Sequence, residues 1–461
     1  MKKSYKIASV LSLCFLLILT ACGGNKNNSG SQSSPSATPS ASGSASPSAS
    51  ASTPAEKVVL KIPHYKAGAN VGAKFFLPQI DRFNKKYEGQ YEIQIEEVPD
   101  DKYRDKIKLL WQQKKLPALV ESGDREFIEQ LIKNGEIYDL KPWLDTKPDL
   151  QKVFIEDSVK FNTQDGHIYT MPLAVTRPTG IYFNKEMFQK AGITKPISQM
   201  TFEEFDQACE ALKKAGFTPL SLMTGENGWT TMLLGTAFLA GQPGGADVLK
   251  DTAITYDYTS PMWVSTFTEI QKWLQKYSSP NAIGAKYADA ANAFLNEKAA
   301  MIANGPWMVG DFSDTTKAPA GFDQKVGFSL SPGGVGIDNV QGYSWWIPNG
   351  LSQGETDAAL AFMEFRMTPE ELKQWMIAEG GFAPNLPASD EVNSKVSPIL
   401  GEFNKQSTTD LKVLVKAMQD VWPNQIGQSE FGRYLALLAK GSVTPEQFAK
   451  QLTQKAQQFK K

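Results

Sequence analysis

Three tryptophans placed at turns, Trp229, Trp307 and Trp345, are the side chains of this sequence best suited to recognising a ligand. Each comes shortly after a glycine, and a tryptophan at a turn is harder to explain as core than one on a helix face. Flat indole rings suit the C–H faces of pyranose rings, while carboxylate and amide groups bond hydroxyls. We therefore predict that these tryptophans, with Glu226 and Asn227 beside the first, contact a polar ligand. Packing between or inside domains is the alternative explanation for each.

Other tryptophans are predicted to pack in the interior. Trp345 and Trp346 are neighbours on an expected strand, so their side chains point to opposite faces and at most one can contact a ligand. Four more lie at positions with helical spacing: Trp111, Trp263, Trp273 and Trp375. We expect these four to fill helix interfaces.

Further candidates lie where expected strands end. Residues 58–134 alternate strand-like and helix-like patterns, which predicts a parallel sheet covered by helices. Ligands of such sheets bind beyond the carboxyl ends of the strands. Tyr65 follows the first strand, and Glu121 and Asp124 follow the third, so all three are predicted contacts. Asp124 is equally well placed to cap the next helix.

The segment 166–188 is interpreted as a crossing between two domains. It contains two short strand patterns, interrupted by Pro172 and Pro178. An extended segment broken by prolines can join two domains while holding their spacing. Arg177 lies inside it and is predicted either to hold a polar ligand or to pair with a carboxylate of one domain.

Motifs for catalysis and metal binding are weak. The sequence has 2 histidines and lacks HExxH, G-x-S-x-G and P-loop patterns, which disfavours a catalytic zinc, a serine nucleophile and a phosphate loop. We predict no metal, no cofactor and no enzymatic activity, while the abundant carboxylates leave a glycosidase pair open. Cys209 lies on an apolar helix face and is predicted to be buried. The formal net charge of −1 argues against nucleic acid as a partner.

The start of the chain predicts export and attachment to a membrane. Lysines precede an apolar run at 7–19, which is typical of a signal peptide and too short to span a bilayer. The run ends in Leu19-Thr20-Ala21-Cys22, which resembles a bacterial lipobox. That resemblance implies removal of residues 1–21 and lipidation of Cys22; an ordinary signal peptide with a chance cysteine is the alternative. Residues 22–56, rich in Ser, Ala and Pro, are predicted to form a disordered tether.

Several landmarks further along resemble those of the extracellular solute-binding proteins that serve bacterial ABC importers. They are Tyr169–Pro172, Tyr182–Lys185 and Ala191–Ile193 around the crossing; Phe294–Met301 followed by Gly305–Trp307; Gly342–Pro348; and Thr368–Glu370 after a helix. Asn296-Glu297 departs from the pattern, because the family usually has a glycine there. Together the landmarks cover nearly the whole chain after the tether.

This resemblance implies an α/β fold of the two-lobed, type II periplasmic-binding-protein class, with a ligand cleft between the lobes. The implied first lobe is residues 57–174 with 327–367, and the implied second lobe is 175–326 with 368–461. The implied hinge lies near 174–180.

The function that the resemblance implies is that of a monomeric receptor, lipid-anchored on the outer face of the cell membrane. Such a receptor captures a sugar or oligosaccharide by hinge closure and delivers it to the permease of an ABC importer. The loop with Asn385 resembles one that borders the cleft, which makes Asn385 a further predicted contact. Two alternatives stay open: the same fold with a peptide, polyamine or anion as ligand, and a secreted carbohydrate-active enzyme.

Overall fold

The computed structural model describes residues 56–68, 70, 72–121, 124–251, 253–387 and 389–460. The predicted signal peptide, Cys22 and all of the predicted tether except Glu56 lie outside these residues. Residues 55–461 form one compact unit. No helix of the described part of the chain combines the length and apolar character that crossing a bilayer requires.

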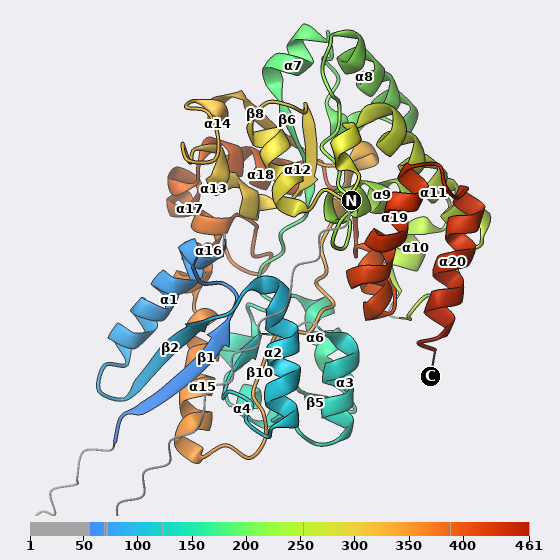
Figure 1. Cartoon of the computed structure of the whole chain (residues 1–461). Coiled ribbons are helices and arrows are strands. Elements are labelled where there is room, and N and C mark those ends of the chain that lie inside the picture. Colours follow the sequence, from blue (N-terminus) through green and yellow to red (C-terminus); the bar gives the residue numbers. More distant parts are fainter. Residues whose placement is uncertain are drawn as a thin grey trace, which may run out of the picture. The chain divides into compact units, whose positions relative to one another are not determined.

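The described part of the first lobe contains three separate pairs of strands, and the longest pair is seen in Figure 1. β1 (Val58–His64) and β2 (Tyr91–Glu97) run parallel and are connected by α1 (Ala73–Lys86). β3 (Val120–Glu121) pairs antiparallel with β10 (Trp345–Trp346), which comes from far along the chain. The predicted alternation of strands and helices is confirmed. The predicted parallel pairing is confirmed for β1 and β2. β3 instead pairs with β10, a partner that the sequence around β3 does not indicate.

Helices cover these strands, with α15 against β1 and α16 against α1. The remaining elements of this lobe are α2 (Asp100–Gln112), α3 (Arg125–Lys133), α4 (Lys141–Asp145), α5 (Pro148–Gln151), α6 (Glu156–Asn162), β4 (Thr163–Gln164), β5 (His167–Ile168), α15 (Gln353–Arg366) and α16 (Pro369–Glu379).

The second lobe is organised around β6 (Gly180–Asn184), which follows the crossing. β6 lies between β7 (Met301–Asn304) and β8 (Val326–Ser329) and pairs antiparallel with both. A separate pair, β9 (Val335–Ile337) and β11 (Val413–Val415), runs parallel.

The other helices are α7 (Lys185–Lys190), α8 (Phe202–Lys214), α9 (Trp229–Ala240), α10 (Gly245–Lys250), α11 (Pro261–Lys272), α12 (Tyr287–Leu295), α13 (Val309–Phe312), α14 (Phe322–Lys325), α17 (Asp390–Lys395), α18 (Pro398–Thr409), α19 (Phe431–Ala439) and α20 (Pro445–Gln457). Short helical turns are η1 (Ile197–Gln199), η2 (Trp273–Tyr277), η3 (Pro280–Ala282), η4 (Pro306–Met308), η5 (Pro332–Gly334), η6 (Met418–Val421) and η7 (Ile426–Glu430).

Local sequence explains where several helices begin. Thr201 accepts a bond from the backbone of Glu204 and the Glu204 carboxylate returns one, which is the predicted capping box of α8. Thr368 and Thr444 cap α16 and α20 in the same way at their side chains, and each is followed by a proline at the first helical position. These caps position helices and contribute no chemistry.

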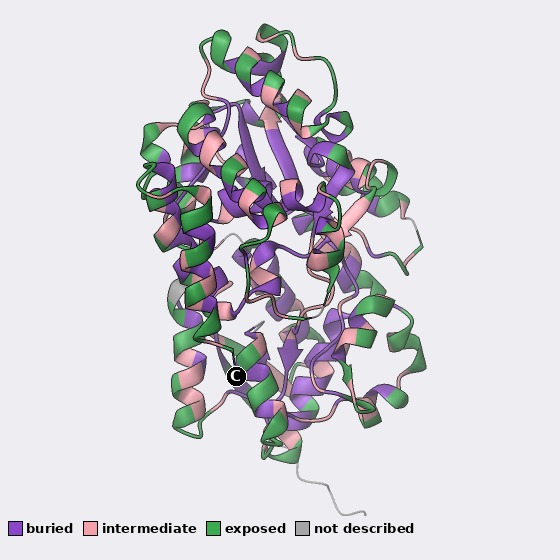
Figure 2. Cartoon of the chain, turned by 90° about the vertical axis from the view of Figure 1, so that its right-hand side faces the viewer, coloured by how far each residue is buried: buried purple, intermediate pink, exposed green. Residues whose placement is uncertain are grey.

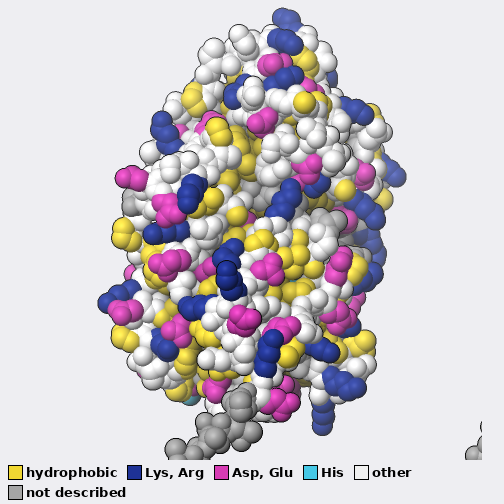
Figure 3. Space-filling view, turned by 90° about the vertical axis from the view of Figure 1, so that its left-hand side faces the viewer, with side chains coloured by type: hydrophobic (Ala, Val, Ile, Leu, Met, Phe, Trp, Pro, Cys, Tyr) yellow, Lys and Arg dark blue, Asp and Glu magenta, His cyan; other side chains and the backbone are white. Residues whose placement is uncertain are grey.

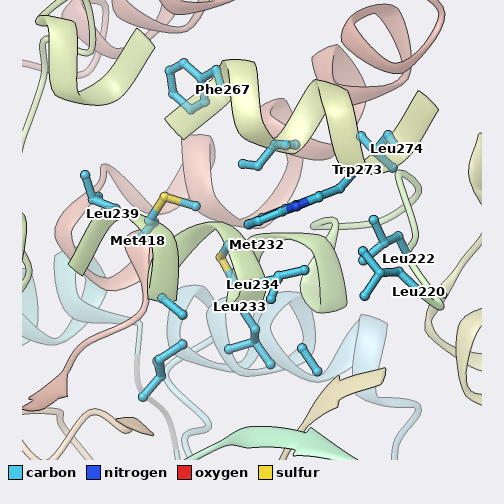
Figure 4. Close-up of a cluster of buried hydrophobic side chains, with 14 of the residues drawn as sticks. Leu220, Leu222, Met232, Leu233, Leu234, Leu239, Phe267, Trp273, Leu274 and Met418 are labelled. Carbon is cyan, nitrogen blue, oxygen red and sulfur yellow. The ribbon is translucent and has the colours of Figure 1, made fainter. Parts of the chain in front are cut away.

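Each lobe has its own hydrophobic interior, and the buried residues lie on the strands and on the inward faces of the helices (Figure 2). In the second lobe the core surrounds α9, where Met232, Leu233 and Leu234 lie near Trp273 (Figure 4). Cys209 belongs to this core and is buried, as predicted. The two lobes are thus packed around separate hydrophobic cores.

The core residues place two of the connections between lobes differently from the predicted boundaries. β8 and β9 pack in two core clusters of the second lobe, the first with Tyr182 and the second around α9. Tyr182 of β6 lies opposite Phe328 of β8, and Thr179 bridges to Ile337 of β9. α16 instead packs in the first-lobe core through Leu372. We therefore propose that the second connection lies near residue 340, and that the third lies after α16.

Candidate functional site

Arg177 lies where the lobes meet and contacts residues of both. Its Nη1 donates to Oε2 of Glu379, the last residue of α16, at 2.8 Å. Its guanidinium carbon lies 5.3 Å from the centre of the Trp375 ring and 5.8 Å from that of Trp307. Of the two roles predicted for Arg177, the structure shows the pairing with a carboxylate.

Trp307 is the middle residue of the turn η4, and its ring is held from several sides. Gly305 is needed there, because a Cβ at this position would lie 2.2 Å from the Trp307 ring. Asn304, fully buried, accepts from the Gly305 N–H at 2.9 Å and donates to the Tyr287 hydroxyl at 3.0 Å. The Trp307 indole bonds the same hydroxyl. These bonds orient a half-buried ring without any ligand.

Trp229 stands beside Trp307, with ring centres 6.2 Å apart and planes inclined by 44°. It is the first residue of α9. Glu226 precedes it and accepts from the backbone N–H of Tyr287 at 2.9 Å, which ties this loop to α12. The half-buried Asn227 follows Glu226 in the same loop. The second lobe therefore brings four of the predicted contact residues to one place.

Glu121, at the end of β3 in the first lobe, is bound through both carboxylate oxygens. Lys66 Nζ lies 2.8 Å from Oε1, and His64 Nε2 lies 2.9 Å from Oε2. Because His64 Nδ1 accepts the Lys66 N–H, the proton of the neutral ring is on Nε2. Burial opposes ionisation of Glu121, but Lys66 and His64 outweigh it and hold the pKa of Glu121 well below its usual range. Tyr65 stacks on His64 with ring centres 4.9 Å apart.

Three predicted contacts have partners that favour the alternative explanation. Asp124 caps α3 and pairs with Lys108 at 2.7 Å. Asn385 donates to the backbone carbonyl of Phe154. Trp345 is 2% exposed, because pairing of β10 with β3 turns its ring into the first-lobe core. Burial thus favours the packing alternative for Trp345, whose ring is covered by His64 and Arg366, and all these residues stay predictions.

Sequence reasoning missed the residues that surround Arg177. Glu379 lies 202 positions away, so no spacing rule links it to Arg177. Trp375 was expected in a helix interface, yet its ring is only half-buried and faces the cation. Asp338 Oδ2 accepts from Thr176 Oγ1 and from the Arg177 N–H, both at 2.6 Å. The prolines and glycines around the crossing indicate a junction between domains. They do not indicate which distant residues contact Arg177.

One cavity at the junction is small. A cavity of about 30 Å³ lies between Lys74 of α1, Glu379 of α16, and Trp307 and Asp311 of the second lobe. That volume holds about two waters, which is too little for a sugar. A larger hollow of about 660 Å³ lies within the second lobe beside α12. No aromatic ring is among the described residues that line it, and we assign it no ligand.

Asp420 in η6 is influenced by charges from both lobes, and its titration can be tested directly. Burial raises the pKa of Asp420 to about 6, with Lys416 and Arg104 acting to lower it and Asp338 to raise it. Since the ordinary pKa is 3.8, the folded protein binds this proton more tightly than the unfolded chain does. Ionisation of the buried Asp420 therefore lowers the free energy of unfolding. This loss is absent below pH 3.8, grows as the pH rises, and reaches its full size above about pH 6.

Replacing Asp420 with Asn is thus expected to raise the melting temperature at pH 7.5 by more than at pH 4.5. The exposed Asp357 of α15 provides the control, since D357N should change neither value appreciably. An equal gain from D420N at both pH values would show that ionisation of Asp420 is not its cause.

The sequence is similar to those of known bacterial and archaeal binding proteins. The family described as "Bacterial extracellular solute-binding protein" matches residues 79–400. An uncharacterised ABC transporter extracellular-binding protein of Pyrococcus horikoshii is 25% identical over 272 residues, which are 59% of this chain and 58% of that protein. A multiple sugar-binding protein of Streptococcus mutans is 31% identical over 149 residues, 30% of this chain and 34% of that protein. The chain thus spans about a third to three-fifths of these relatives' length.

Among solved structures, a chitin oligosaccharide binding protein superposes with a TM-score of 0.71 at 21% identity. The match covers 87% of this chain and 99% of that one. At such identity the likeness concerns the fold, and it confirms the predicted two-lobed α/β architecture.

Proposed function

Because the chain belongs to the family of bacterial extracellular solute-binding proteins, we propose that it captures a neutral sugar or oligosaccharide and passes it to the permease of an ABC importer. The observation that carries this proposal is the pair of tilted indole rings, Trp229 and Trp307, beside Arg177 where the lobes meet. Such rings offer apolar faces to the C–H faces of a sugar. The similarity to a multiple sugar-binding protein supports the same ligand class.

The charges near the rings favour a neutral ligand. Arg177 is paired with Glu379, and Lys66 with Glu121. An anion entering here would have to displace a carboxylate from either cation, at the cost of leaving that carboxylate unpaired. The Glu121 oxygens keep lone pairs that accept hydrogen bonds from sugar hydroxyls. The wider surface adds no attraction on the face shown in Figure 3, where acidic and basic side chains are interspersed.

Binding proceeds by closure of the lobes and involves no covalent step. Sugar stacks on the second-lobe rings and, as the lobes approach, its hydroxyls reach Glu121 of the first lobe. The ligand thereby interacts more strongly with the closed form than with the open one and shifts the population toward it. The closed form is what docks on the permease. The Asp338 carboxylate accepts from the Thr176 hydroxyl and the Arg177 N–H, and Thr176 pairs with Phe382 through the backbone. We propose that the lobes rotate about these crossing segments.

The site of action that we propose is the outer face of the cell membrane. Cys22, in its lipobox-like sequence, is the proposed point of lipidation, and the Ser- and Pro-rich stretch after it is the proposed tether. Replacing Cys22 with Ser is expected to move the protein from the membrane fraction to the soluble fraction. Continued recovery of C22S with membranes after a salt wash would contradict the anchor.

A thermal-shift screen tests the ligand class. The probes are maltotriose, raffinose, chitotriose and xylotriose, set against glycerol 3-phosphate, inorganic phosphate, spermidine and a tripeptide. A ligand at a hundred times its dissociation constant stabilises the folded state by about 2.7 kcal/mol. We expect one of the sugars to raise the melting temperature and the charged probes to leave it unchanged.

Each other outcome has a definite meaning. A rise with a charged probe alone would keep the family and overturn the neutral sugar. Chromatography of the incubated sugar covers the enzymatic alternative, because a receptor returns its ligand unchanged while a hydrolase releases shorter chains.

A further inference from the structure

Arg177 contacts both lobes at the crossing. Its ion-pair partner Glu379 and its ring partner Trp375 lie one turn apart on α16 of the first lobe. Its other ring partner, Trp307, belongs to the second lobe. A single guanidinium therefore joins a first-lobe helix to a ring that we propose as a sugar platform.

The backbone around Arg177 is held independently of any ligand. The N–H and the carbonyl of Thr176 both bond Phe382, at 3.0 Å each. Asp338 bonds the Thr176 hydroxyl and the Arg177 N–H. Gly381 leaves room for the side chain, because a Cβ there would lie 2.6 Å from Arg177 Cγ. The backbone of Arg177 is thus held in the crossing segment, while its guanidinium reaches residues of both lobes.

The contacts that Arg177 makes differ from those of a ligand-binding arginine. The guanidinium already bonds a carboxylate and lies over two indole rings, with 24% of the side chain exposed. A partly exposed ion pair by itself contributes little. A cation held over aromatic rings away from water contributes more, and here the two rings belong to different lobes. Separation of the lobes must break one of these ring contacts.

We propose that Arg177 is a positioning residue that stabilises the closed arrangement of the lobes by linking Trp307 to α16, without bonding the sugar itself. This inference rests on the proposed function for its purpose, while the link itself is made by groups of the protein alone. The closed form is favoured before a sugar arrives, and the apparent affinity rises with the fraction of protein that is closed. The link also couples ligand contact to closure, since a sugar stacked on Trp307 keeps that ring in reach of Arg177.

The test compares Arg177→Met, Arg177→Lys and Glu379→Gln by small-angle X-ray scattering without ligand, in the full chain with Cys22→Ser. R177M keeps the bulk of the side chain but removes the cation, and we expect it to reduce the closed-to-open ratio about tenfold and to increase the radius of gyration. R177K keeps the charge without the planar group and should lie between R177M and wild type. E379Q should shift the ratio less than R177M does, because both ring contacts remain.

Arg433 is the matched control. It is an exposed arginine that pairs with Glu430 and lies 5.1 Å from the centre of the Tyr434 ring, within one lobe. R433M should leave the scattering unchanged. A double variant, R177M with Trp307→Ala, should open the protein no further than R177M alone, since either change breaks the same link.

Other results would overturn the proposal. If R177M lowers the melting temperature without changing the scattering, Arg177 is merely structural. If the scattering is unchanged and only the affinity for the sugar identified in the screen falls, Arg177 is a ligand contact. If no probe in the screen binds, the proposed function fails, while the ligand-free scattering still decides whether Arg177 links the lobes.

Discussion

Replacing Trp307 with Ala is expected to weaken binding of the sugar identified by the screen by about 30- to 1,000-fold, the range found when a central aromatic anchor is truncated. The ring is half-buried beside Trp229, and its N–H bonds the Tyr287 hydroxyl, so its plane is fixed before the ligand arrives. Its removal takes away the stacking surface and the second-lobe partner of Arg177 together. Titration calorimetry with the purified variant measures the loss.

Two further variants make this result interpretable. Trp307→Phe keeps a flat ring but not the N–H, and it should recover most of the stacking. Trp143→Ala removes a half-buried tryptophan from α4 of the first lobe and should leave affinity unchanged. Should W307A bind as tightly as wild type, the sugar platform lies elsewhere and the proposed function loses the observation that carries it.

Removal of the Glu371 carboxylate is expected to produce the largest loss of stability, about 1–3 kcal/mol, as is typical when buried donors lose their acceptor. The loss stays in this range because the Arg82 side chain is 38% exposed and regains water. Glu371 is 4% exposed and accepts two bonds from Arg82, each at 2.7 Å. Gln79 donates to the same carboxylate at 3.1 Å and accepts from Arg366, which is itself 3% exposed. Without the carboxylate, these groups of α1 and α15 lose the acceptor at the centre of their network.

The measurement is urea-induced unfolding of Glu371→Ala, followed by far-UV circular dichroism. Its neighbour Glu370 is exposed in the first turn of the same helix, so E370A is the control and should cost well under 1 kcal/mol. Because α16 also carries Trp375 and Glu379, a destabilised α16 should weaken sugar binding as a secondary effect. If E371A unfolds at the same urea concentration as the wild type, the hydrogen-bond network around Glu371 makes no net contribution to stability.

Several features of this protein could be predicted because they depend on residues close in sequence. The capping box of Thr201 forms within one turn of helix. β6 ends and α7 begins at Asn184, whose side chain accepts from the backbone of Glu186 and Met187. The order of strands and helices in the first lobe follows from hydrophobic periodicity, which requires no knowledge of partners. Local chemistry also indicated that residues around 177 form a junction.

The roles of the tryptophans, in contrast, depended on contacts between distant segments. Trp307 and Trp345 both follow glycine-containing turns, yet the first is half-buried at the lobe junction and the second is core. The difference arises because β10 pairs with β3, which places Trp345 in one first-lobe cluster and Trp346 in another. The prediction that these two side chains point to opposite faces of the strand is confirmed. The alternation of side chains along a strand, however, does not show that other segments cover both of its faces.

Helices and strands, their caps and the family landmarks were therefore predictable, since each of these depends on a few neighbouring residues. Only the tertiary structure decided that Arg177 pairs with Glu379, that β8 belongs with β6, and that α16 packs on the first lobe. These pairings join residues that are far apart along the chain, and their energy depends on which surfaces meet. No pattern within a segment carries that information, so the site at the lobe junction emerged only from the fold.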